Sequence, residues 1–137
     1  MLDSSVIVSA FRSRRGASYR LLGLVAERRL VPLATAALFL EYEDVLKRPE
    51  QRAVSGLTLN QVDDALAALA SVIEPVEVRF TWRPQLNDFG DEMVFDAAIN
   101  GRADALVTHN LAGFAAAAPR FGLVVLPPGE VLKRMTS

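Results

Sequence analysis

The chain has no cysteine and a single histidine among its 137 residues. Without cysteine, a disulfide scaffold and every thiolate metal site are excluded. One histidine also excludes a zinc site built mainly from imidazoles. A metal ion here would have to be held by oxygen ligands, which favours hard ions such as Mg²⁺ or Mn²⁺.

Several signatures of common enzyme classes are also absent. The eight glycines never form a G-x-G pair, so the dinucleotide fingerprint and the Walker phosphate loop are missing. There is no G-x-S-x-G motif, and one histidine leaves little scope for a Ser-His-Asp triad. A receiver domain needs a lysine at the end of its last strand, where this chain has Pro127-Pro128.

Long apolar runs are missing as well. The longest, residues 31–40, is about ten residues and too short to span a bilayer. The first residues lack the basic start and apolar core of a signal peptide. With 51% hydrophobic and 23% charged residues, the composition is that of a globular protein. We therefore expect one cytoplasmic domain over residues 1–137.

Charge is unevenly distributed along a chain whose formal net charge is −1. Residues 1–52 carry nine Lys and Arg against six Asp and Glu, whereas residues 53–137 carry six against ten. A basic part joined to an acidic part suggests a surface for an anionic partner beside a cluster of carboxylates.

Helix and strand signals alternate along the sequence. Apolar spacing and capping residues predict helices at 19–30, 36–48, 59–73 and 91–100, and a short alanine-rich helix ending at Ala118. Apolar runs predict strands at 30–34, 76–80, 105–107 and 123–126. Buried strands separated by helices indicate an α/β protein with a parallel sheet, whose ligands gather at the carboxyl ends of the strands.

Two acidic residues stand out by position. Asp3 follows Leu2, at the end of whatever first strand the N-terminus forms. Glu41 lies between Leu38 and Val45 on the apolar stripe of its helix. Because a carboxylate on a buried stripe is costly unless it is paired or bound to metal, we favour a functional role for Glu41.

Acidic residues also surround the start of the 91–100 helix. Asp88 is most simply a helix cap, and Asp91 and Glu92 in the first turn either complement the helix dipole or bind a metal. Thr108 and Asn110 end the 105–107 strand, and we interpret His109 between them as a loop residue.

Four segments resemble, in order, motifs of one protein family. Residues 3–10 (D-S-S-V-I-V-S-A) resemble its opening D-T-N-V-L-V-S-A, and residues 40–49 (L-E-Y-E-D-V-L-K-R-P) resemble its E-Y-E-x-V-L-x-R-P segment. Residues 88–94 resemble its D-P-D-D-x-x-x helix start, and residues 103–110 resemble its A-D-x-L-V-T-x-N/D segment. The family is that of PIN domains, and the branch is that of the VapC-like toxin ribonucleases.

This resemblance implies an α/β/α sandwich around a central parallel sheet and a Mg²⁺- or Mn²⁺-dependent endoribonuclease. The matching positions imply that Asp3, Glu41 and Asp91 are the catalytic, metal-binding carboxylates. The remaining site positions are further ligands or supporting residues. They are Asp88 and Asn110 as additional ligands, and Ser5 and Thr108 as supports.

The resemblance also implies partners: RNA, an antitoxin protein and a second copy of the chain. Arg12, Arg14 and Arg15 follow the first motif and are expected to contact RNA phosphates, with Arg20 close behind. Ser5 and Gly113 depart from the family pattern, which has Asn and commonly Asp at these places. A degenerate PIN domain that binds RNA or protein without cleavage is therefore the alternative function.

Overall fold

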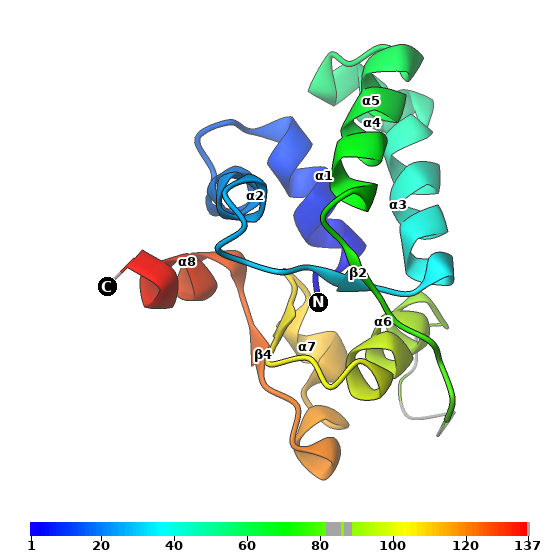
Figure 1. Ribbon diagram of the computed structural model, residues 1–137, viewed down its shortest axis with the longest axis vertical. Coiled ribbons are helices and arrows are strands. Elements are labelled where there is room, and N and C mark those ends of the chain that lie inside the picture. Colours follow the sequence, from blue (N-terminus) through cyan, green and yellow to red (C-terminus); the bar gives the residue numbers. More distant parts are fainter. Residues whose placement is uncertain (82–85, 87–88, 137) are drawn as a thin grey trace.

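The computed structural model describes residues 1–81, 86 and 89–136. Helices make up most of this part of the chain, and Figure 1 labels them along the sequence. They are α1 (Ser4–Arg12), α2 (Ala17–Ala26), α3 (Ala36–Lys47), α4 (Pro49–Ser55), α5 (Leu59–Ala70), α6 (Phe89–Asn100), α7 (Leu111–Phe114), the 3₁₀ helix η1 (Ala118–Phe121) and α8 (Pro128–Thr136). None of these helices is long and apolar enough to cross a membrane.

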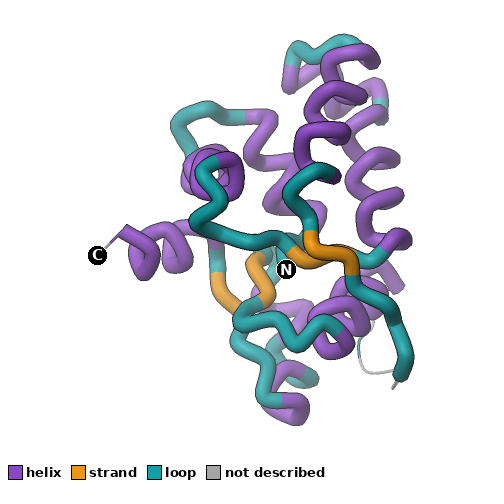
Figure 2. The backbone as a smooth tube through the Cα atoms, in the orientation of Figure 1, coloured by secondary structure: helices purple, strands orange, loops and turns teal. Residues whose placement is uncertain are grey.

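The strands form two separate pairs, both parallel. β1 (Leu33–Ala34) pairs with β2 (Glu74–Pro75), and β3 (Leu106–Val107) pairs with β4 (Val125–Leu126). Leu2 adds a single parallel bridge to Val107, and Figure 2 shows the N-terminus between the two pairs. The α/β class is confirmed, but the single central sheet that the resemblance implies is not clearly seen in the described residues.

The strands lie between two groups of helices. In Figure 1, α1 to α5 are above the strands, whereas α6, α7 and η1 are below them. Fully buried side chains from both groups and from the strands form one core. Those with the least exposure include Leu2, Ile7, Leu21, Leu38, Tyr42, Phe95, Leu106 and Phe114. Both residues of β3 are buried, as its unbroken apolar sequence predicts.

The first residues place the N-terminal segment against β3. The Met1 amine donates to the Ala105 carbonyl at 3.2 Å, and the amides of Val107 and Asp3 continue the ladder at 2.9 Å each. Burial lowers the pKa of the Met1 amine to about 6, although the nearby Asp104 carboxylate opposes this shift. Directly after Asp3 the chain enters α1, which buries Val6, Ile7 and Ala10 at helical spacing.

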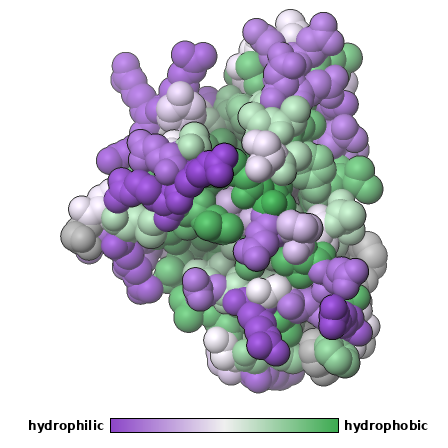
Figure 3. Space-filling view, in the orientation of Figure 1, coloured by the Kyte–Doolittle hydropathy of each residue, from purple (hydrophilic) through white to green (hydrophobic). Residues whose placement is uncertain are grey.

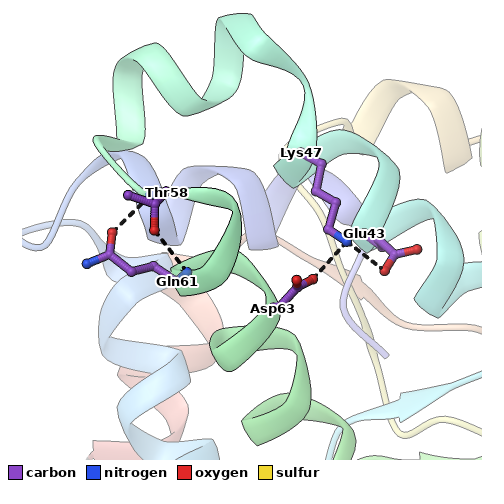
Figure 4. Close-up of polar contacts among 5 residues, drawn as sticks. All are labelled: Glu43, Lys47, Thr58, Gln61 and Asp63. Atoms are coloured by element: carbon purple, nitrogen blue, oxygen red, sulfur yellow. Dashed lines mark hydrogen bonds and ion pairs between the residues drawn. The ribbon is translucent and has the colours of Figure 1, made fainter.

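Two predicted helix starts are confirmed in atomic detail. Thr35 Oγ1 accepts from the Leu38 amide at 3.0 Å and caps α3. Thr58 and Gln61 form a capping box at the start of α5, drawn in Figure 4. The Lys47 ammonium on α3 bridges Glu43 at 3.1 Å and Asp63 of α5 at 2.7 Å. Of these contacts, the Lys47–Asp63 ion pair joins α5 to α3.

The predicted strand at 76–80 is wrong, since β2 ends at Pro75 and residues 76–80 lie outside any strand. The side chain of Asn100 explains the difference. Its Oδ1 accepts from the amides of Arg79 and Phe80, and its Nδ2 donates to the Phe80 carbonyl. A side-chain amide therefore satisfies the backbone groups that a neighbouring strand would otherwise pair.

Candidate active site

A pocket of about 320 Å³ lies at the carboxyl ends of the N-terminal segment and of β3. Segments distant in sequence meet there: the start of α1, the middle of α3, the first turn of α6 and the residues after β3. Its lining consists of Asp3, Ser4, Ser5, Val8, Glu41, Gly90, Asp91 and Asn110. The structure thus brings together the three carboxylates predicted as catalytic, along with Ser5 and Asn110.

Asp3 is the most deeply buried of these carboxylates. Its side chain is only 6% exposed, and Oδ2 accepts hydrogen bonds from Ser5 Oγ at 2.9 Å and Thr108 Oγ1 at 2.7 Å. No hydrogen bond from the described residues reaches the other oxygen, Oδ1. Two hydroxyl donors on one oxygen orient the carboxylate. Ser5 and Thr108 therefore lie where a supporting role requires them.

Glu41 and Asp91 reach the same pocket from two helices. Glu41 is half-buried on α3, flanked along the helix by the buried Leu38 and Val45. Asp91 is in the first turn of α6, where the exposed amide ends of the helix favour negative charge. Both positions suit a carboxylate that faces a cation.

Asn110 connects the end of β3 to Asp91. Its Oδ1 accepts from the Gly113 amide at 3.3 Å and caps α7, while its Nδ2 donates to Asp91 Oδ2 at 3.1 Å. The Asn110 amide also donates to Thr108 Oγ1 at 2.9 Å. One chain of hydrogen bonds therefore runs from Asp3 through Thr108 and Asn110 to Asp91.

Gly113 leaves the space in which this contact forms. A Cβ atom at this position would lie 2.4 Å from Asn110 Nδ2 and 2.8 Å from Asp91 Oδ2. Real Cβ atoms essentially never come so close to other heavy atoms. The glycine that departs from the family pattern is therefore required by the observed placement of Asn110.

His109 has a role that sequence reasoning missed. Its amide donates to Ser5 Oγ at 3.2 Å, and its ring Nε2 shares a hydrogen bond of 3.1 Å with the buried Ser18 Oγ of α2. His109 thus ties the start of α2 to the end of β3. No pattern in the sequence pairs Ser18 with a residue 91 positions away.

Four basic residues lie close to this tie. Arg12 follows Val8 of the pocket by one helical turn on α1, and Arg14 and Arg15 are exposed in the connection from α1 to α2. Arg20 is exposed on α2. Since Ser18 is hydrogen-bonded to His109, the connection passes beside the strand end that carries Asn110.

The predicted metal set is only partly assembled. Asp88 lies outside the described residues. Within the described ranges, no group of three or more His, Cys, Asp or Glu side chains is close enough to hold a metal ion. The donors nevertheless fit Mg²⁺ or Mn²⁺ chemically, because the pocket offers carboxylate and amide oxygens and no sulfur.

Two further acids are buried near this site on α6. Glu92 is 4% exposed, and its Oε1 accepts from the Leu86 amide at 2.6 Å. Asp96 lies one turn later and is 2% exposed. Glu92 was already singled out from the sequence, whereas Asp96 was not. Its place one helical turn after Glu92 in the predicted 91–100 helix was the signal that could have identified Asp96.

Comparisons with known proteins identify the family. No curated protein and no solved structure matches the chain. A family model described as "PIN domain" matches residues 1–112, which include every segment quoted above for the resemblance. PIN domains are in general nucleases and typically depend on divalent metals. With most of its length matched, the chain belongs to the PIN-domain family.

Proposed function

We propose that this protein is a Mg²⁺- or Mn²⁺-dependent endoribonuclease and the toxin of a toxin–antitoxin pair. The observation that carries the proposal is the convergence of Asp3, Glu41 and Asp91 on one pocket, beside an exposed arginine-rich connection. Carboxylates suit the metal, and arginines suit the phosphates of RNA.

Asp3, Glu41 and Asp91 would hold the ion, with Asn110 and Asp88 as additional ligands. The bound ion would supply an activated water and stabilise the charge that develops on the phosphate. Ser5 and Thr108 orient Asp3 through the two hydrogen bonds to Oδ2. Arg12, Arg14 and Arg15 would bind RNA phosphates on either side of the cleaved bond.

The proposal also covers the branch of the family, the inhibitor and the assembly. We place the chain in the VapC-like branch, with an antitoxin protein as its inhibitor and a homodimer as its assembly. As a member of this branch, the chain would have the α/β/α sandwich of the family, in which helices cover one continuous parallel sheet. Support for the branch comes from the sequence of residues 40–49 and 103–110.

RNA cleavage with Mn²⁺ tests the enzyme directly. Purified protein should cut single-stranded RNA, and Asp3→Asn or Asp91→Asn should lower the rate more than about a hundredfold, since the metal contributes several kcal/mol. Asp64→Asn is the matched control, because Asp64 is an exposed acid on α5 far in sequence from the pocket residues. Cleavage that survives in both site variants would refute the mechanism.

A binding module without cleavage is the second candidate. It is favoured by the absence of a close cluster of three ligands among the described residues. Thermal unfolding with added Mn²⁺ separates the two functions, because an ion that binds only the folded chain stabilises it by about 2.7 kcal/mol at a hundred times its Kd. Retained RNA binding with no such shift at millimolar Mn²⁺ would favour the binding module.

A further inference from the structure

One residue, His109, joins the start of α2 to the candidate active site. Its ring Nε2 shares a hydrogen bond of 3.1 Å with Ser18 Oγ, and its backbone amide donates to Ser5 Oγ at 3.2 Å. Ser5 Oγ in turn donates to Asp3 Oδ2 at 2.9 Å. A path of hydrogen bonds therefore runs from the Asp3 carboxylate in the pocket, through His109, to the first turn of α2.

Ser18 is a buried polar residue at the second position of α2. It is only 1% exposed, and His109 is the one hydrogen-bond partner of its Oγ within the described ranges. The helix also begins without a side-chain cap, because its N-cap residue is Gly16. A buried hydroxyl is costly to leave without a partner. The ring of His109, which is itself exposed, therefore holds this end of α2 in place.

The connection between α1 and α2, residues 13–16, depends on what holds its two ends. Towards α1, the Ser13 amide continues the helical hydrogen bonds at 3.2 Å. The backbone groups of Arg14 and Arg15 make no hydrogen bond to any described residue. Figure 3 shows hydrophilic side chains that project from this corner of the molecule, above α2. The place of the two arginines therefore follows from the ends of the connection, and the Ser18 contact lies just beyond the α2 end.

We infer that His109 is a positioning residue for RNA, which holds the arginine-bearing connection at a fixed place relative to the carboxylate pocket by its contact with Ser18. The inference rests on the proposed ribonuclease function, because it needs RNA phosphates bound at Arg14 and Arg15 and chemistry at Asp3. Arginines that bind neighbouring phosphates set where the cleaved bond lies in the pocket. A misplacement of about 1 Å can lower a rate about a hundredfold.

Removal of the contact with Ser18 should change catalysis more than binding. In His109→Ala the arginines still bind phosphates, so the Kd for RNA without divalent ions should change by less than about twofold. The kcat should fall at least about tenfold, since the bound RNA lies wrongly in the pocket. The backbone amide of residue 109 still reaches Ser5, so the stabilisation of the folded chain by Mn²⁺ should be unchanged.

Cleavage with Mn²⁺ and fluorescence anisotropy without metal give kcat and Kd for a matched set of variants. His109→Gln carries a side-chain amide close to the place of the ring Nε2 and should restore kcat, whereas the shorter His109→Asn should not. Ser18→Ala should lower kcat as His109→Ala does, and the double variant should fall no further, because both remove the same contact. Ser71→Ala is the control, since that hydroxyl bonds to the nearby Ala68 carbonyl of α5.

NMR order parameters of the Arg14 and Arg15 amides measure their placement without any activity. They should fall in His109→Ala and Ser18→Ala and recover in His109→Gln. Unchanged kcat or unchanged order parameters in His109→Ala, beside an active wild type, would overturn the inference and leave the proposed function standing. Failure of both Ala variants to fold, or an equal loss of kcat and RNA binding, would overturn it in favour of a merely structural contact. An inactive wild type would instead refute the proposed function, and the inference with it.

Discussion

At the scale of single residues, hydrogen bonds from Ser5, Thr108 and Asn110 connect the carboxylates of the candidate site. Thr108 is fully buried and donates to Asp3, while it accepts from the Asn110 amide. A buried hydroxyl with both a donor and an acceptor role is well satisfied. Asp3, Glu41 and Asp91 were predicted as catalytic carboxylates, and the structure places all three on one pocket. Their metal-binding role stays a prediction. Sequence reasoning missed the tie between Ser18 and His109, since hydroxyl pairing over 91 positions leaves no local pattern.

Gly113→Ala tests whether the absence of a side chain at this position is needed for the contact between Asn110 and Asp91. The new methyl group would collide with the side-chain ends of Asn110 and Asp91, which are flexible and can move. The Tm should therefore change by only a few degrees, while the Asn110 side-chain amide signals in an NMR spectrum should shift. RNA cleavage should fall in parallel. Gly23→Ala is the control, because a Cβ there meets nothing within 4 Å, and unchanged Asn110 signals in Gly113→Ala would contradict the prediction.

At the scale of elements, helix starts that depend on local capping residues were predicted correctly, whereas elements that depend on distant contacts were not. The starts of α3 and α5 follow from Thr35 and Thr58, whose capping patterns are local. No element was predicted for residues 4–12, which form α1, because the burial of Val6 and Ile7 against distant segments decides that helix. The predicted 76–80 strand failed for a similar reason: Asn100, about 20 positions away, takes its backbone groups.

Thr58→Ala measures the local contribution of the capping box. Loss of the Thr58 hydroxyl leaves the Gln61 amide without its acceptor, so the free energy of unfolding should fall by about 1 kcal/mol. Thr58→Ser keeps the hydroxyl and should retain most of that stability. Denaturant titration of the three proteins provides the comparison, and a Ser variant as unstable as the Ala variant would contradict a capping role.

The ion pair between Lys47 of α3 and Asp63 of α5 should contribute less to stability than the capping box. Hydrogen bonds to Asp63 and Glu43 raise the pKa of Lys47, yet the Asp63 side chain is 56% exposed. Exposed ion pairs contribute between zero and about 1 kcal/mol and are screened by salt. The capping box of Figure 4 should therefore matter more for α5 than the ion pairs beside it.

At the scale of the whole molecule, the two sheets are joined by side chains more than by strands. Tyr42 of α3 is 2% exposed, and its hydroxyl donates to the Leu2 carbonyl. This bond connects the helices above the strands to the segment that carries Asp3. The fold class was readable from alternating helix and strand signals, but the division into two sheets was not, because it depends on which backbone edges meet.

Tyr42 should make the stability of the whole protein fall in alkaline solution. Burial, with smaller contributions from Asp3 and Glu41, raises the pKa of the Tyr42 phenol well above its usual 10.0. The unfolded chain then releases this proton near pH 10 while the folded chain keeps it. The free energy of unfolding should therefore drop above pH 10 by up to about 1.4 kcal/mol per pH unit from this group.

Tyr42→Phe should remove that part of the slope and cost about 1–3 kcal/mol at neutral pH, because the Leu2 carbonyl loses its donor. Tyr19→Phe is the matched control, since Tyr19 is 45% exposed and the slope should persist there. Denaturant unfolding between pH 7 and pH 11 gives both quantities, and an undiminished slope in Tyr42→Phe would exclude this group as the origin of the alkaline instability.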